Sequence, residues 1–339
     1  MEYIYFGTYT KRSSQGIYRT KFNSNTGQFS KLQLVAKETN PTYLTFTDDD
    51  YLYSVGSLDG RGGLACFDHA FHLLEHLVEE GAAPCYVGTD DVRNLVFTAN
   101  YHTGQVLVYK RQDNGSIILS DRIQHQGSGP HPNQNQARIH FADLTPDHYL
   151  VTCDLGTDDL TTYALSRAGK VQPIGNFAMP AGAGPRHLVF HPHFKHAFVV
   201  CELNSTLQNL LYQGCGYFEA YQTISTIPED YTGFNAPAAI AITKDGRFLY
   251  VSNRGHNSIA CYTFVLDGYI HLVEILPSHG QTPRNICLTT DEHYLIVAHQ
   301  NSDNVTVFKR DLDTGRLEKL SHDFQVPEAV CVLAKKTNE

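Results

Sequence analysis

The segments YLIVAH (residues 294–299) and NVTVFKR (residues 304–310) decide the fold, because the same pair of runs recurs along the whole chain. Both runs are rich in β-branched and aromatic residues, which favour strands, and a short polar break separates them. The first run also appears as YIYFG (3–7), YLYSVG (51–56), LVFTAN (95–100), YLVTCD (149–154), AFVVCE (197–202) and FLYVSN (248–253). The matching second runs begin at Gly16, Gly63, Gln105, Asp159, Leu207 and Ser258.

Equivalent positions in successive first runs are 43 to 54 residues apart, which is the period of a propeller blade. Each copy contains two further strands. A turn and a strand follow the second run, as in DGYIHLVEIL from Asp267, and an apolar strand precedes the first run, as in PRHLVF from Pro185. The sequence therefore predicts an all-β, seven-bladed β-propeller with four antiparallel strands per blade.

The two ends of the chain complement each other. The first residues form a first run directly, with no apolar strand ahead of it, and the segment VPEAVCVL from Val326 matches the missing strand. We expect this C-terminal strand to close the N-terminal blade, so that residues 1–339 form a single propeller domain with no isolated sheet edge.

Composition narrows the range of partners and compartments. The formal net charge is −9 and the pI is about 6.0, which gives no bulk attraction for nucleic acid or anionic lipid. No apolar run approaches the length of a membrane span, and the N-terminus lacks the pattern of a secretory signal. The eight cysteines form no C-x-x-C pair and lie mostly in β-rich runs, so we expect reduced thiols and a cytoplasmic protein.

Polar side chains gather where the apolar first strand of a blade begins and the next strand ends. Because these strands are antiparallel, both places lie at one mouth of the central channel. Ionisable groups are concentrated there on consecutive blades. The candidate residues are Arg138, His140, Arg186, His187, Glu202, Asn204, Asn235, Arg254, Arg284 and Gln300.

A glutamate, a histidine and two arginines in one pocket suit the opening of a lactone ring. A carboxylate or an imidazole can move a proton, and arginines can hold an anionic group and stabilise an oxyanion. No G-x-S-x-G nucleophile motif is present. Purely structural roles stay open for these residues. Glu202 and Arg254 can form an ion pair between neighbouring blades, His140 can be hydrogen-bonded to the backbone, and Asp154 can cap a turn.

The segment HPHFKH contains three histidines, His191, His193 and His196, at a spacing that suggests metal ligands. These residues occupy the turn between the first two strands of their blade, on the face opposite the predicted pocket. A motif outside its structural context is weak support for a metal site. We therefore expect neither a metal nor another cofactor.

Seven segments of the chain resemble the seven-bladed propeller lactonase family. They are QGSGPHPNQ from Gln126, DLGTD from Asp154, GPRHLVFHP from Gly184, ELNST from Glu202, SNRGHNSI from Ser252, TPRN from Thr282 and NSDNVTVF from Asn301. Bacterial propeller-type 6-phosphogluconolactonases belong to this family, and so do fungal carboxy-muconate lactonizing enzymes. The resemblance implies an active-site set of one histidine, two arginines and one glutamate, which match His140, Arg186, Arg254 and Glu202. The sequence departs from the family at Ala137-Arg138, where the family has Pro-His.

The resemblance implies a lactonase that hydrolyses a sugar lactone, with conversion of 6-phospho-D-glucono-1,5-lactone to 6-phosphogluconate as the leading candidate. The expected partner is then a small anionic lactone. Two alternatives stay open, a lactonizing cycloisomerase acting on a muconate-like dicarboxylate and a non-catalytic ligand-binding propeller.

Overall fold

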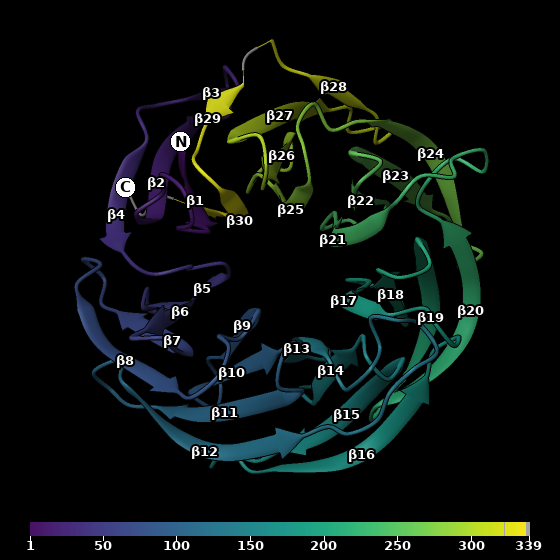
Figure 1. Cartoon of the computed structure of the whole chain (residues 1–339). Coiled ribbons are helices and arrows are strands. Elements are labelled where there is room, and N and C mark those ends of the chain that lie inside the picture. Colours follow the sequence, from purple (N-terminus) through teal and green to yellow (C-terminus); the bar gives the residue numbers. More distant parts are fainter. Residues whose placement is uncertain (322, 337–339) are drawn as a thin grey trace.

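The computed structural model describes residues 1–321 and 323–336, and all regular structure within these ranges is β-strand. The strands form seven antiparallel sheets set around one axis, as Figure 1 shows. This confirms the predicted seven-bladed propeller with four-stranded blades. Within the same ranges no helix has the length and apolar character needed to cross a membrane.

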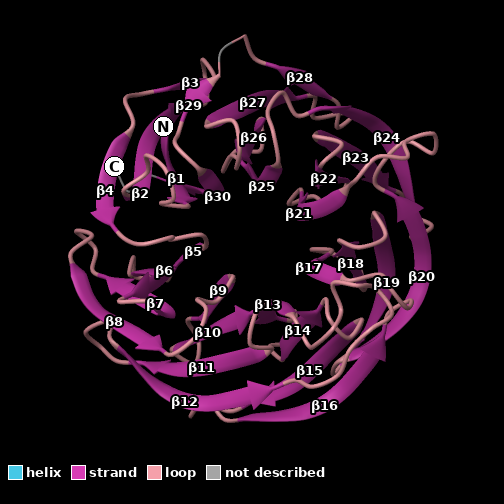
Figure 2. Ribbon diagram, in the orientation of Figure 1, coloured by secondary structure: helices cyan, strands magenta, loops and turns pink. Residues whose placement is uncertain are grey.

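The innermost strands surround the axis, and the other strands follow outward in chain order (Figure 2). The innermost strands are β5 (Leu44–Phe46), β9 (Tyr86–Asp90), β13 (Ile139–Leu144), β17 (Pro185–Phe190), β21 (Ala236–Ile242), β25 (Pro283–Leu288) and β30 (Ala329–Lys336). The second strands are β6 (Leu52–Leu58), β10 (Leu95–Asn100), β14 (Leu150–Asp154), β18 (His196–Cys201), β22 (Phe248–Arg254), β26 (Tyr294–His299) and β1 (Glu2–Thr8). The third strands are β7 (Arg61–Phe67), β11 (Gln105–Arg111), β15 (Asp159–Leu165), β19 (Thr206–Gly214), β23 (Ser258–Phe264), β27 (Asn304–Arg310) and β2 (Gly16–Asn23).

The outer strands are continuous in five blades and divided in the other two. The continuous ones are β8 (Leu73–Glu79), β12 (Ile117–Gln124), β16 (Val171–Ala178), β20 (Tyr217–Ser225) and β24 (Ile270–Pro277). The divided ones are β3 (Gln28–Phe29) with β4 (Gln33–Lys37), and β28 (Leu317–Lys319) with β29 (Phe324–Gln325). An extra residue bulges out between β3 and β4, where the Thr20 hydroxyl donates to the Ser30 carbonyl at 2.9 Å.

The two ends of the chain close the ring as predicted. Strand β30 pairs antiparallel with β1 from Glu2–Lys336 to Thr8–Ala329, so the first blade contains both termini of the described chain. Side chains pack across the junction with the last blade. The buried Phe22 ring of β2 meets the Tyr294 ring of β26 edge-on, with centroids 5.3 Å apart.

Replacing Phe22 with alanine tests this junction. The side chain is fully buried, so the cavity left behind should cost about 3–5 kcal/mol of unfolding free energy. Urea denaturation of the variant measures the loss. The control is Leu266→Ala, because that side chain is 89% exposed and its removal should change stability little. Equal stability of both variants would contradict the described closure.

Candidate functional site

Three side chains at the mouth of the channel sit at irregularities of innermost strands. In the pairing of β13 with β14, Ile139 and Phe141 have partners but His140 between them has none. Arg186 in β17 and Arg284 in β25 occupy the same kind of unpaired position. An extra residue of this type bends the strand and redirects its side chain, a device common beside active sites. His140, Arg186 and Arg284 therefore occupy equivalent unpaired positions in their blades.

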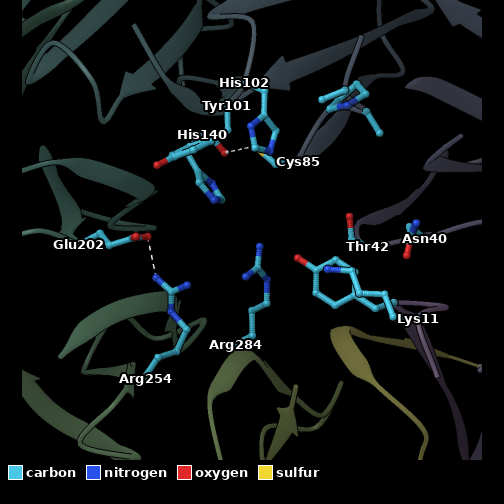
Figure 3. A pocket seen from close by; sticks show the side chains of 14 residues that line it. Lys11, Asn40, Thr42, Cys85, Tyr101, His102, His140, Glu202, Arg254 and Arg284 are labelled. Atoms are coloured by element: carbon cyan, nitrogen blue, oxygen red, sulfur yellow. Dashed lines mark hydrogen bonds and ion pairs between the residues drawn. The ribbon is translucent and has the colours of Figure 1, made fainter. Parts of the chain in front are cut away.

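A cavity of about 390 Å³ opens at this mouth (Figure 3). Its lining comes from strands and loops of seven blades, including the loop that joins β1 and β2. Polar groups dominate it. The polar or ionisable side chains of the lining are those of Tyr9, Lys11, Asn40, Thr42, Cys85, Tyr101, His102, His140, Glu202, Arg254 and Arg284.

Glu202 lies between two arginines. Its Oε2 atom is 2.9 Å from Nε of Arg186 and 2.6 Å from Nη2 of Arg254, which ends β22 on the neighbouring blade. Figure 3 shows the second of these ion pairs facing the cavity. Arg254 also donates through Nε to the Ala236 carbonyl at 3.0 Å, and Arg186 donates to the Ala238 carbonyl. The predicted ion pair between neighbouring blades is therefore present, and Arg186 joins it.

Burial and the neighbouring charges determine the protonation states of Glu202 and Arg186. Burial alone would raise the pKa of Glu202, but the guanidinium groups of Arg254 and Arg186 outweigh it and hold the pKa below the ordinary 4.5. Burial lowers the pKa of Arg186 to about 9, which still leaves this arginine charged at neutral pH. The cluster therefore carries one negative and two positive charges.

His140 lies beside His187, with ring centroids 5.2 Å apart. Burial and the positive charge of Arg186 lower the pKa of both imidazoles well below 6.5, so both rings are neutral at pH 7. Nδ1 of His140 and Nε2 of His187 are buried with no hydrogen-bond partner in the described residues. The interpretation of His140 as a backbone-satisfied histidine is thus wrong for Nδ1, which has no partner among the described residues.

Three further candidate residues, which we predict to bind substrate, are close in the chain to members of this cluster or to a hydrogen-bond partner of one. Arg138 stacks over the Tyr101 ring at 4.7 Å and donates to Asn135 at 2.7 Å. Asn204 accepts from the Thr206 hydroxyl at 2.7 Å, and Asn235 donates to Ser205 at 3.0 Å, so both hold loops at the mouth. Their contact with substrate stays a prediction.

A second cavity, of about 330 Å³, adjoins the first and shares Glu202, Arg254 and Arg284 with it. Gln300 lines this second cavity and accepts a hydrogen bond from Nη1 of Arg284 at 3.2 Å. The predicted residues Arg284 and Gln300 therefore meet at the border between the two cavities.

Most of the cavity wall opposite Glu202 is formed by residues that were not among the candidates. Thr42 and Cys85 directly follow a blade proline, as Arg186 and Arg284 do, and this shared position could have identified them. Lys11 comes from the loop between β1 and β2, which is longer than the equivalent loops of the other blades. No pattern in the sequence marks it.

His191 and His193 lie in the turn between β17 and β18, as predicted, and His196 begins β18. Nδ1 of His191 accepts hydrogen bonds from the backbone N–H groups of His193 and Phe194, both at 3.0 Å. Asp154 likewise caps its turn by accepting from the Gly156 N–H at 2.9 Å. In the described ranges no three His, Cys, Asp or Glu side chains are grouped to hold a metal ion.

Comparison with known proteins gives consistent matches over almost the entire chain. A family model described as "Lactonase, 7-bladed beta-propeller" matches residues 3–334. A Bacillus subtilis protein named 6-phosphogluconolactonase is 39% identical over 338 residues, which cover 97% of each chain. A crystal structure of a Lactobacillus plantarum protein has a TM-score of 0.97 at 42% identity and covers 99% of this chain and 100% of that one. A Pseudomonas aeruginosa periplasmic gluconolactonase has a TM-score of 0.91 at 28% identity, covering 98% of this chain and 99% of that one.

Proposed function

The chain belongs to the seven-bladed β-propeller lactonase family, and we propose that it hydrolyses a sugar lactone, with 6-phospho-D-glucono-1,5-lactone as the leading substrate. One observation carries the proposal: a carboxylate held by two arginines faces a cavity that also exposes a neutral histidine. The name of the Bacillus subtilis relative supports the phosphorylated substrate.

Arg254 and Arg186 are proposed to stabilise the oxyanion. When water adds to the lactone carbonyl, negative charge develops on the carbonyl oxygen, and fixed guanidinium donors nearby lower the energy of that state. Nη2 of Arg254 and Nε of Arg186 lie against Oε2 of Glu202, so the proposal assigns the oxyanion to the other N–H groups of these two guanidinium ions. Because Glu202 fixes both arginines by charge, the donors need little rearrangement during the reaction.

His140 is proposed to move the proton. A neutral imidazole can accept a proton from the attacking water and then deliver it to the ring oxygen as the C–O bond breaks, so that the alkoxide leaves as an alcohol. Glu202 is the weaker base, because two arginines hold it ionised. A bound anionic substrate offsets the neighbouring positive charge and raises the pKa of His140 towards a useful range.

The protonation state of His140 gives a direct prediction. Its C2–H resonance should keep the neutral-imidazole shift from pH 8 down to well below 6.5, since burial and Arg186 disfavour the charged ring. Histidine NMR titration checks this, and the spectrum of His140→Asn identifies the resonance. A midpoint near the ordinary value of about 6.5 would contradict the described environment.

We further propose that the enzyme needs no metal and acts in the cytoplasm, in the pentose phosphate pathway of carbohydrate metabolism. The eight free cysteines agree with a reducing compartment. A panel of lactones tests the substrate: 6-phosphogluconolactone, glucono-1,5-lactone and a muconolactone, each with EDTA present. Turnover of muconolactone alone would instead favour the cycloisomerase, and turnover lost in EDTA would overturn the metal-free proposal.

A further inference from the structure

The loop of residues 9–15 between β1 and β2 brings an ammonium group to the wall of the cavity opposite the arginine cluster. Figure 3 shows Lys11, Asn40 and Thr42 on one side and Glu202 with Arg254 on the other, with Arg284 between them. The cavity therefore has two chemically distinct ends. One end is built around Glu202, and the other around Lys11.

The two ends differ in how their positive charges are balanced. Arg186 and Arg254 share the carboxylate of Glu202. Lys11 rests on the Tyr9 ring at 4.3 Å, and Arg284 bonds to the amide oxygen of Gln300. Within the described chain, neither Lys11 nor Arg284 forms an ion pair with a carboxylate. Lys11 at this end and Arg284 in the middle of the cavity are two cations without a carboxylate partner, and they favour a ligand that places a dianion between them.

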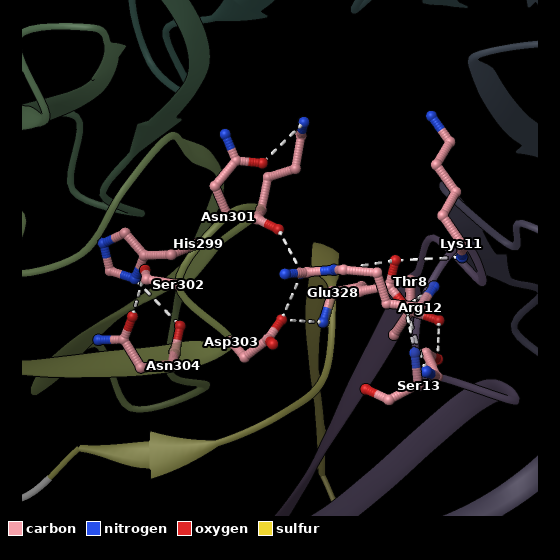
Figure 4. Close-up of polar contacts among 12 residues, drawn as sticks. Thr8, Lys11, Arg12, Ser13, His299, Asn301, Ser302, Asp303, Asn304 and Glu328 are labelled. Atoms are coloured by element: carbon pink, nitrogen blue, oxygen red, sulfur yellow. Dashed lines mark hydrogen bonds and ion pairs between the residues drawn. The ribbon is translucent and has the colours of Figure 1, made fainter.

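A buried glutamate holds the Lys11 loop (Figure 4). The carboxylate of Glu328 accepts hydrogen bonds from four consecutive backbone N–H groups, those of Lys11 at 3.1 Å, Arg12 at 2.9 Å, Ser13 at 3.0 Å and Ser14 at 3.1 Å. Glu328 is only 2% exposed and directly precedes the closing strand β30. The position of Lys11 thus depends on the segment that closes the ring.

Asp303 and Asn40 also hold the loop that carries Lys11. Asp303 accepts from the Glu328 backbone N–H at 2.8 Å and pairs with the Arg12 guanidinium at 2.7 Å. On the other side of the loop, Oδ1 of Asn40 accepts from the Thr10 backbone N–H at 3.0 Å. A loop fixed at both flanks presents its side chain with little ordering cost when a ligand binds.

We propose that Lys11, together with Arg284, binds the phosphate of a phosphorylated sugar lactone, and that Glu328 is the residue that positions Lys11. This inference rests on the proposed function and makes Lys11 the residue that distinguishes a phosphorylated lactone from an unphosphorylated one. The reacting carbonyl then lies at the Glu202 end, and the phosphate lies at the Lys11 end.

The first test compares binding of the two corresponding ring-opened acids, 6-phosphogluconate and gluconate, by calorimetry. Lys11→Met should weaken 6-phosphogluconate binding about tenfold or more, since a charge-assisted contact to phosphate is lost, and gluconate binding much less. The control is Lys31→Met, which removes an exposed lysine between β3 and β4. Equal losses for both acids, or no loss, would overturn the proposal. Because binding needs no turnover, a protein that binds 6-phosphogluconate through Lys11 but hydrolyses no lactone would refute only the proposed function.

The second test concerns Glu328. Glu328→Gln should raise KM for 6-phosphogluconolactone about as much as Lys11→Met, and its effect should fall on KM rather than on kcat. In the double variant the two effects should not add, because both act through one side chain. Additive effects, or a loss in kcat alone, would overturn the positioning role. Asp303→Asn provides a second variant that loosens the same loop from outside the cavity, should Glu328→Gln fold poorly.

Discussion

Replacing Arg254 with alanine is expected to lower kcat/KM for 6-phosphogluconolactone by about 10²–10³-fold, the cost of removing one oxyanion donor. The fold should survive, because Glu202 keeps its ion pair with Arg186, 2.9 Å away. Steady-state kinetics measure the first effect, and thermal unfolding followed by circular dichroism checks the second.

The matched control for this variant is Arg167→Ala, which removes an exposed arginine from the turn between β15 and β16. Its kcat/KM should equal that of the wild type. An unchanged kcat/KM in Arg254→Ala would remove this residue from the mechanism. A loss of activity that accompanies unfolding would assign Arg254 a structural role instead.

Changing Glu202 to glutamine should damage both activity and stability. The side chain keeps its shape, but two arginines then face each other without a counter-ion, and breaking a buried pair of this kind costs about 3 kcal/mol. Because the arginines lose the charge that fixes them, kcat/KM should fall by about 10²-fold, as when one preorganised oxyanion donor is lost. Urea denaturation and kinetics measure the two losses.

The stability difference between Glu202→Gln and wild type should depend on pH. The pKa of Glu202 is lower in the folded protein than the ordinary 4.5, so ionised Glu202 stabilises the fold above that pH. As the pH falls through the folded pKa, the carboxylate of the wild type becomes protonated and this stabilisation is lost. The two unfolding free energies should therefore converge in acid. A difference that stays constant from pH 7 into the acid range would contradict the described ion pairs.

The sequence allowed the strands and their ring to be predicted, because each blade repeats the same alternation of strand and turn. The match between YIYFG at the start and VPEAVCVL at the end also predicted the pairing of β1 with β30. The division of the outer strand into β3 and β4 could not be predicted, since it arises from a bulge opposite Thr20 and not from a turn signal.

The candidate site was only partly predictable, for a physical reason. Glu202 and Arg254 lie at strand ends, so the topology alone brings them to one mouth. His140 is a candidate from its place near the start of the strand, but it reaches the cavity from an unpaired position in β13 that a pattern with a period of two residues does not reveal. Lys11 depends on a loop held by Glu328, 317 residues away in the chain, and no local pattern encodes that contact.

The most direct test of the lactonase proposal is the rate of ring opening of 6-phosphogluconolactone generated in situ, measured with and without the purified protein. The proposed function predicts a rate well above spontaneous hydrolysis that is proportional to protein concentration and falls close to background in Arg254→Ala. A wild-type rate equal to spontaneous hydrolysis would contradict the assignment of this lactone.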